Sequence, residues 1–237
     1  MTNDLPLAID PYPWLDYYDH WFERVRDGVP VWRRNTRPDF PGRTAQLTTL
    51  AEALTSFGAP ARVPPFGVAG AEPLVGPSPS PHERVIAYER EDLHQGQGRY
   101  LTNLADVPAG TLWVAFVPPP GGRGQSVRWL RVGRHAFALR YVSDDDWRSN
   151  VDTSAIDVEG LALPAPVMAM TDELMRRARS PLLAVDCTVA EGGGLWATDL
   201  NWAPGLRGSG VQDHLPARAC ADAIKRSWYE LHGLATP

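Results

Sequence analysis

The sequence predicts an α+β fold that combines antiparallel strand pairs with helices. Two pairs of strand-like runs are each joined by a short turn, one pair within residues 127–142 and the other within residues 182–201. Three further segments, 47–57, 164–179 and 216–232, carry apolar residues at helical spacing. Because strands joined by tight turns pair antiparallel, we expect antiparallel sheets with helices packed against them.

Residues 1–83 predict two helices and a connector. Apolar residues in 15–26 recur at spacings of three and four and predict a short helix. The run 47–57 predicts a second helix, which Gly58 ends. The stretch 59–82 is rich in proline and glycine, so we expect a connector with little regular structure.

From residue 84 onward, strand-like runs predominate. Runs of β-branched and aromatic residues bounded by turn residues predict strands, and amphipathic runs predict helices that begin near a proline. The expected strands before the last hairpin are 84–88, 111–117, 127–132 and 136–142, and the expected helices are 164–179 and 216–232.

Composition indicates a globular, intracellular chain. The 237 residues are 43% hydrophobic and 22% charged, enough for one large domain or two small lobes that share a core. No run approaches the roughly 18 apolar residues of a membrane helix, and the N-terminus does not read as a signal peptide. Two cysteines, Cys187 and Cys220, make no disulfide framework, so we expect a cytoplasmic protein without membrane partners.

The net charge of the chain argues against nucleic-acid binding, and its basic residues are almost all arginine. The net charge of −5 argues against general affinity for nucleic acid. Of the 23 lysines and arginines, only Lys225 is a lysine. A GC-rich genome explains that bias without any function. Even so, a phosphate bound here by a cationic side chain is expected to be bound by arginine, whose planar fork favours bidentate contacts.

The hairpin within residues 182–201 predicts two opposed carboxylates. If Gly192 and Gly193 form a two-residue turn, Asp186 falls directly opposite Asp199. The two-residue period of a strand then places Asn201 on the same face as Asp199. Like charges facing each other at about 4.5–5.5 Å between Cβ atoms are unfavourable. A magnesium ion bound by these oxygens would remove that penalty. The alternatives are a solvated acidic face, or a three-residue turn or bulge that breaks the register.

Three other segments are candidates for ligand contacts. Glycines in the loop 89–99 would let backbone amides approach an anion, although an ordinary hairpin turn explains them equally well. The strand that ends at Phe116 and Val117 breaks at three prolines, which fits either a hinge or a surface loop. Arg128 and Arg140 lie in neighbouring strands and are candidates for the ligand side of a sheet.

Taken in this order, these segments resemble the ATP-grasp superfamily of carboxylate–amine ligases, over about residues 84–232. Asp186, twelve intervening residues, Asp199-Leu200-Asn201 and a following Pro-Gly are similar to the family's aspartate, Glu-x-Asn and Pro-Gly turn. Residues 127–140 resemble its Arg-x-x-Val-x-Gly strand pair. Asp146-Trp147-Arg148 is similar to a motif of ligases that cyclise ribosomal peptides, and residues 94–98 resemble the flexible glycine-rich loop over the triphosphate.

The resemblance implies two lobes, each with an antiparallel sheet and helices, that hold a nucleotide between them. It places the hinge near 117–124 and the nucleotide- and metal-binding region at 84–237, and it leaves 1–83 as an atypical N-terminal region. The implied cofactors are ATP and Mg2+. The implied metal ligands are Asp186, Asp199 and Asn201; Arg128 and Arg148 would stabilise the transferred phosphoryl group; Arg90, Gly96, Gln97, Gly98, Phe116, Val117 and Arg140 would bind the nucleotide; Arg207 and Gly208 would bind substrate.

The chain departs from the family pattern at its phosphate-binding cations. The family's lysines for the α- and β-phosphates are absent, and Arg90 is the best replacement. The resemblance implies an ATP- and magnesium-dependent ligase that forms an amide through an acyl phosphate, on a peptide or a small amino-acid-like substrate. Two alternatives remain: a non-catalytic nucleotide- or peptide-binding protein of the same fold, and a phosphotransferase that uses the same metal site. A homodimer is compatible with the sequence.

Overall fold

The computed structural model describes residues 25–26, 29–30, 42–89, 98–143, 146–149, 153–159, 163–202, 204–206 and 209–233. The helix expected over 15–26 lies outside these residues except for its last two. Those two form strand β1 (Val25–Arg26), which pairs with β2 (Val29–Pro30). No helix of the described part of the chain is both long and apolar enough to cross a membrane.

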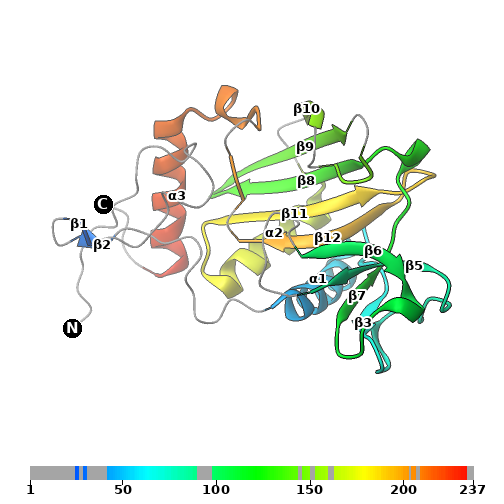
Figure 1. Ribbon diagram of the computed structural model, residues 1–237. Helices are drawn as coiled ribbons and strands as arrows, with labels where there is room; N and C mark the ends of the chain where they lie inside the picture. Colours follow the sequence, from blue (N-terminus) through cyan, green and yellow to red (C-terminus); the bar gives the residue numbers. More distant parts are fainter. Residues whose placement is uncertain are drawn as a thin grey trace.

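The larger sheet has five strands in the order β10-β9-β8-β11-β12, and each neighbouring pair is antiparallel. The β8–β9 and β11–β12 hairpins are the two strand pairs expected from the sequence, and β11 pairs with β8 to join them (Figure 1). Strand β10 was not expected. The strands are β8 (Gln125–Val132), β9 (His135–Ser143), β10 (Thr153–Glu159), β11 (Leu182–Val189) and β12 (Leu195–Asn201).

The smaller sheet has the order β4-β3-β7-β5-β6 and is also antiparallel. The expectation that 59–82 has little regular structure was wrong, because this stretch contains β3 and β4 and β3 pairs with β7. Pro73 is tolerated because it starts an edge strand, where a missing N–H costs no ladder bond. The strands are β3 (Phe66–Val68), β4 (Pro73–Val75), β5 (Arg84–Tyr88), β6 (Arg99–Asn103) and β7 (Leu112–Ala115).

The helices agree closely with the sequence expectation. They are α1 (Arg43–Phe57), α2 (Ala165–Ala178) and α3 (Ala217–Leu231), with single 3-10 turns at Leu104–Asp106, Pro120–Gly122 and Val211–Asp213. Helix α1 starts four residues earlier than expected and ends at Gly58, whose φ of 63° is the left-handed value that glycine adopts without strain. The earlier start brings Arg43 into the helix.

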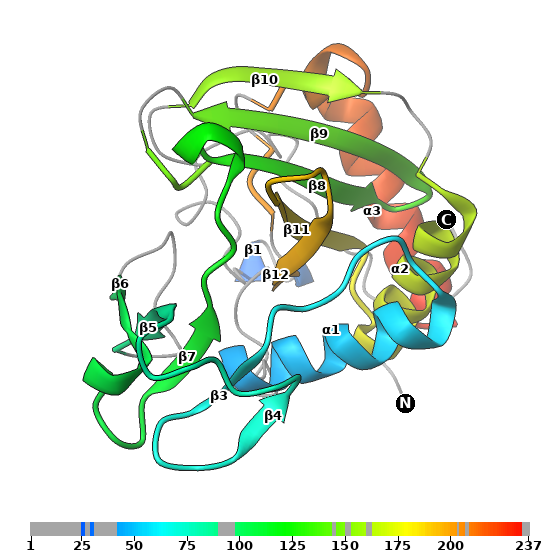
Figure 2. The same ribbon diagram turned by 90° about the vertical axis from the view of Figure 1, so that its right-hand side faces the viewer.

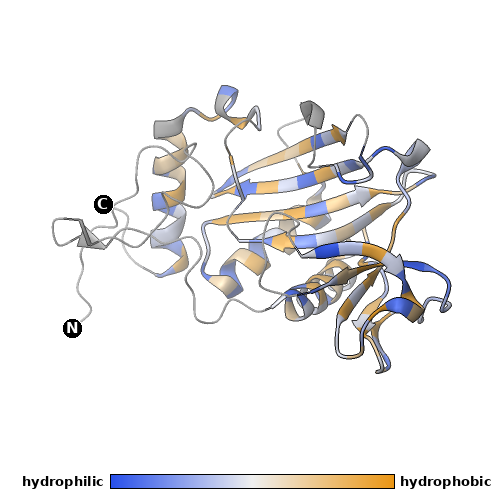
Figure 3. Ribbon diagram, in the orientation of Figure 1, coloured by the Kyte–Doolittle hydropathy of each residue, from blue (hydrophilic) through white to orange (hydrophobic). Residues whose placement is uncertain are grey.

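The two faces of the larger sheet pack against different helices (Figures 1 and 2). Alternation along β8 sends Trp129 to one face, where it joins a core with residues of α1 and α2. The same alternation sends Leu130 and Val132 to the other face, where they pack against α3. Hydrophilic positions interrupt the mostly hydrophobic strands β8, β9 and β11 (Figure 3). The hydrophilic positions include Arg128 and Arg131 of β8 and Asp186 of β11.

Helix α1 connects the two sheets. It lies beside β12 of the larger sheet and beside β4 of the smaller one (Figure 2). Leu47 and Leu50 of α1 are fully buried in the core that also contains Phe66 of β3. The sheet of β5–β7 is therefore packed onto elements that precede residue 84.

Arg131 ties α2 to the larger sheet. Its side chain is only 4% exposed, although it is charged. One terminal nitrogen donates to the Thr171 hydroxyl at 2.7 Å, and the other forms an ion pair with Asp172 at 2.7 Å. Both terminal nitrogens are thus paired, which reduces the cost of burying the charge, whereas the buried Nε has no hydrogen-bond partner. This arginine is structural and is turned away from the face that carries the candidate site.

We predict that Arg131→Met lowers the free energy of unfolding by about 1–3 kcal/mol, because it leaves the buried Thr171 hydroxyl without its donor. Urea denaturation measures the change. The control is Arg134→Met: Arg134 pairs with Glu230 at 2.8 Å, but its side chain is 79% exposed. That variant should change stability by less than about 0.5 kcal/mol. Equal losses in the two variants would contradict the structural role of Arg131.

Candidate active site

The predicted juxtaposition of Asp186 and Asp199 is confirmed, although the expected turn was wrong. The strands pair Asp186 with Asp199 directly. The loop has three residues rather than two, because the Ala190 N–H donates to the Gly194 carbonyl. That change shifts the register by one residue, and a bulge at Thr198, between the pairs Cys187–Ala197 and Asp186–Asp199, shifts it back. The two irregularities cancel.

Arg128 compensates the charge of Asp186. It lies directly opposite Asp186 on β8, so both side chains leave the same face of the sheet. Nε of Arg128 donates to Oδ1 at 2.6 Å and a terminal nitrogen donates to Oδ2 at 2.8 Å, which is the bidentate geometry of a strong ion pair. The guanidinium also lies 5.4 Å from the centre of the Tyr141 ring. Burial raises the pKa of the Tyr141 hydroxyl, which favours its neutral form.

Arg43 compensates the charge of Asp199. It is the first residue of α1, and a terminal nitrogen of its guanidinium donates to Oδ1 of Asp199. The guanidinium lies 5.7 Å from the centre of the ring of Tyr88, the last residue of β5. Arg43 therefore touches residues of both sheets. Burial opposes its charge, but Asp199, Tyr88 and Asp186 outweigh burial and raise its pKa. Sequence analysis missed this residue because no local pattern singles it out.

Two arginines thus provide the compensation that the sequence argument assigned to a metal. The metal site predicted for Asp186, Asp199 and Asn201 stays a prediction. The carboxylates are not sealed off, because the side chains of Asp186 and Asp199 are 23% and 30% exposed. Each carboxylate has about four lone-pair sites, so the contacts to arginine do not exhaust its oxygens.

The oxygens of Asp186, Asp199 and Asn201 suit Mg2+. Asn201 pairs with Ala184, two residues along from Asp186, and therefore shares the face of both aspartates. Two carboxylates and an amide oxygen match the preference of a hard divalent cation that also keeps water or phosphate ligands. Within the residues that the structure describes, no three His, Cys, Asp or Glu side chains form a metal-binding group.

The Asp146-Trp147-Arg148 segment reaches the edge of the same face. Asp146 accepts hydrogen bonds from Nε and a terminal nitrogen of Arg148, at 3.0 and 2.7 Å, and these bonds lower the pKa of the Asp146 carboxyl. Ser149 donates to the Ser126 hydroxyl at 2.7 Å. Ser126 lies two residues before Arg128 on β8, so it shares the face of Arg128. The structure therefore places Arg148 close to Ser126, on the face of β8 that also carries Arg128.

Phe116 and Val117 begin the connection between the two sheets. The Phe116 N–H donates to the Arg84 carbonyl at 3.1 Å, so this amide is used within the smaller sheet and is not open to a base edge. The Phe116 ring contacts Trp147 edge to face, with centroids 5.5 Å apart. The Arg84 guanidinium lies 5.2 Å from the centre of the Phe116 ring. The Phe116–Trp147 contact packs the start of the expected hinge against the Asp-Trp-Arg segment.

Arg140 and Gly98 do not join the acidic pair. Arg140 pairs with Val127, one residue from Arg128, so it leaves the opposite face of the sheet, where a terminal nitrogen donates to Gln125 at 3.5 Å. The Gly98 carbonyl accepts from the Glu89 N–H at 2.8 Å and closes the β5–β6 loop. The remaining candidates lie outside the described residues: Arg90, Gly96, Gln97, Arg207 and Gly208.

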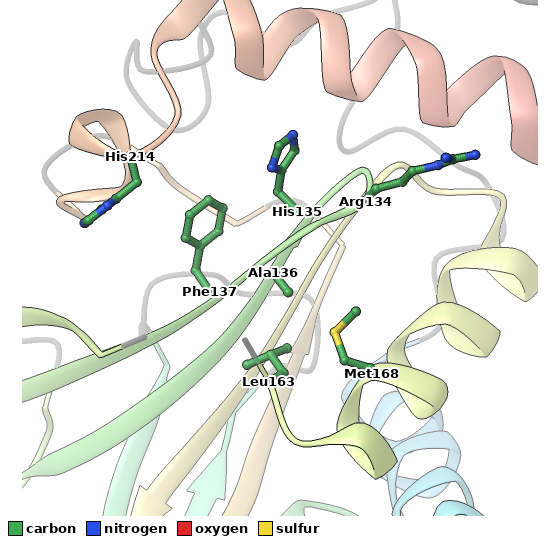
Figure 4. Close-up of a pocket in the computed structure, with 7 residues that line it drawn as sticks. All are labelled: Arg134, His135, Ala136, Phe137, Leu163, Met168 and His214. Atoms are coloured by element: carbon green, nitrogen blue, oxygen red, sulfur yellow. The ribbon is translucent and has the colours of Figure 1, made fainter. Parts of the chain in front are cut away.

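A pocket of about 320 Å³ lies at the other end of the larger sheet (Figure 4). Its lining comes from β9, the start of α2 and the segment before α3: Arg134, His135, Ala136, Phe137, Leu163, Met168 and His214. The rings of His135 and His214 point apart, so they do not converge on a common ligand (Figure 4). Arg128 lies four residues along β8 from the β8–β9 turn, or about 13 Å. The pocket is therefore separate from the acidic pair.

No family model matches the chain, and no curated protein matches it. Among solved structures, it is similar to the ATP-grasp ligase PsnB complexed with minimal precursor, with 14% identity and a TM-score of 0.50 over 83% of this chain and 64% of PsnB. It is also similar to a RiPP-associated ATP-grasp ligase of Chryseobacterium gregarium (14% identity, 83% of this chain, 62% of that one, TM-score 0.48). A third is D-alanyl-alanine synthetase A of Vibrio cholerae (11% identity, 80% of this chain, 67% of that one, TM-score 0.48).

The likeness to PsnB confirms the predicted ATP-grasp fold. At 14% identity it establishes the fold alone. The chain spans less than two thirds of the length of PsnB.

We predict that Gly124→Ala destabilises the protein by about 1–3 kcal/mol. A Cβ atom at Gly124 would lie 2.6 Å from backbone atoms of Trp147, Arg148 and Ser149, which cannot rotate away. The measurement is the urea unfolding midpoint. Gly194→Ala is the matched control, because the nearest atom to a Cβ there is the Trp196 ring nitrogen at 3.9 Å. If both variants unfold at the same urea concentration, the close packing of Gly124 against this segment is refuted.

Proposed function

We propose that this ATP-grasp chain is an ATP- and magnesium-dependent carboxylate–amine ligase. It would form an amide through an acyl phosphate on a peptide or a small amino-acid-like substrate. The observation that carries the proposal is the row formed by Arg128, Asp186 and Asp199 across three adjacent strands. PsnB, which has the same fold, is an ATP-grasp ligase that binds a minimal precursor.

In this proposal the phosphates of a nucleotide bound between the two sheets would lie against the row. Asp199 belongs to the larger sheet, and Arg43 connects it to Tyr88 at the end of β5 in the smaller sheet. The loop that follows Tyr88 contains the glycines expected to cover a triphosphate. The connection from β7 to β8, which begins at Phe116, is the counterpart of the hinge.

In this proposal Asp186, Asp199 and Asn201 hold Mg2+, which would neutralise charge on the transferred phosphoryl group. Arg128 lies beside Asp186 and would contact the oxygens of that group. Arg148, on the loop next to Ser126, would stabilise the acyl phosphate. Preorganised cations act on developing charge without reorganising, so positioning and electrostatics supply most of the rate enhancement.

The reaction needs no nucleophile from the protein. A substrate carboxylate oxygen bonds to the γ-phosphorus as the bond to the ADP oxygen breaks. The amine nitrogen then bonds to the acyl carbon, the bond from that carbon to the phosphate oxygen breaks, and the amine gives up a proton. The products are the amide, ADP and phosphate.

One observation favours a second candidate, a nucleotide-binding protein without turnover. Arg128 and Arg43 are paired with Asp186 and Asp199 and compensate their charges without a metal. Such a protein would show a higher melting temperature with Mg–ATP but would release no ADP. A phosphotransferase would release ADP but no free phosphate.

We predict that Asp199→Asn and Asn201→Ala each reduce magnesium-dependent turnover by at least about 100-fold and leave the protein folded. The assay measures ADP and phosphate release with a panel of acidic amino acids and peptides as acceptors. Hydroxylamine is added to trap an acyl phosphate as the hydroxamate. Asp213→Asn is the control, because Asp213 is exposed on the 3-10 turn before α3. Undiminished turnover in both site variants would refute the metal assignment.

A further inference from the structure

Arg43 is a cation beside the acidic pair, on the side of the smaller sheet. It begins α1, pairs with Asp199 and lies against Tyr88. Tyr88 directly precedes the β5–β6 loop, which the Glu89–Gly98 hydrogen bond closes. Arg43 therefore lies between Tyr88, at the end of β5, and the acidic pair. The only lysine of the chain, Lys225, is on α3.

The charges of the four central side chains cancel. Asp186 and Asp199 contribute two negative charges, and Arg128 and Arg43 contribute two positive charges. A bare divalent cation that approaches this group meets carboxylates already neutralised, and it must displace a guanidinium or share its oxygens. A displaced guanidinium whose side chain is 16% exposed would then lack a partner.

We propose that Arg43 is a phosphate-binding residue of this site, and that Asp199 holds its guanidinium in place until a metal–nucleotide complex arrives. The inference rests on the proposed function, since it requires Asp199 to bind metal. Binding would replace one ion pair with two contacts. Asp199 leaves Arg43 for the metal, and the guanidinium leaves Asp199 for a phosphate oxygen of the nucleotide. Neither charged group of the broken ion pair is left without a partner.

The exchange explains why an arginine suits this position. A guanidinium stays charged at every pH at which a protein folds, and its planar fork can pair with either a carboxylate or a phosphate. The helix fixes the Cα of Arg43, so only the side chain has to move. Metal and nucleotide then bind cooperatively, because each supplies the partner that the other displaces.

The test measures two affinities that should change in opposite directions. In Arg43→Gln, Mn2+ alone, used in place of Mg2+, should bind about tenfold more tightly or better, because its competitor is gone. Mg–AMPPNP should bind about tenfold more weakly or worse, because a phosphate contact is lost. Titration calorimetry measures both, and the EPR signal of free Mn2+ checks the first. A merely structural role for Arg43 would weaken both ligands together.

Two further variants serve as controls. Arg43→Lys keeps the positive charge and should return the Mn2+ affinity to within about threefold of the unmodified protein. Arg134→Gln removes an exposed guanidinium at the opposite end of the sheet and should change neither affinity.

The proposal is overturned if Arg43→Gln leaves Mn2+ binding unchanged or weakens it, or if Mg–AMPPNP binding is unaffected. Asp199→Asn separates this failure from failure of the proposed function. If Asp199→Asn abolishes Mn2+ binding while Arg43→Gln does not strengthen it, the metal site stands and the exchange is wrong. If Asp199→Asn leaves Mn2+ binding unchanged, the metal assignment and the exchange both fail.

Discussion

Two aspartates that face each other on neighbouring strands repel at about 4.5–5.5 Å between Cβ atoms. Asp186 and Asp199 are in this position, and each is bonded to a guanidinium of different origin. Arg128 comes from the adjacent strand, so its position follows from sheet register alone. Arg43 comes from α1 and depends on how that helix packs against β12 and β4. The acidic pair therefore links the arrangement of the two sheets to the electrostatics of the site.

The hairpin shows how a site can be predicted when a local detail is wrong. Strand pattern and glycine content in the sequence were enough to place Asp186 opposite Asp199. The three-residue loop and the bulge at Thr198 each break the simple count by one residue, in opposite directions. Side chains that share a buried face restrict register strongly, since a slip of one residue would expose Leu200 and bury Asp199. The core on the other face thus selects the register that the carboxylates need.

Other features depended on contacts between distant segments, which periodicity cannot report. Strands β3 and β4 are three residues each, too short to give an alternating pattern; β3 pairs with β7, and β4 pairs with β3. Arg43 has no neighbour in the sequence that marks it, since its partner is 156 positions away. Arg140 shows the effect of a single turn residue. The expected strands 127–132 and 136–142 leave a three-residue turn, which would place Arg140 opposite Arg128. In the structure Val132 pairs with His135, so the turn has two residues and Arg140 falls opposite Val127.

The site lies on the sheet face that packs against α3, at the point where apolar side chains are followed by charged ones. On the face that packs against α3, Leu130, Leu139 and Ala184 are fully buried. Continuing along β8 and β11 on that same face, Arg128 and Asp186 follow at the next inward positions. The buried apolar positions of β8 and β11 hold these strands in place. The charged positions on the same strands are therefore held in place as well, although they are only partly buried. A ligand therefore meets a row whose charges are already placed and mutually compensated, so binding has to exchange ion pairs but does not have to order the strands.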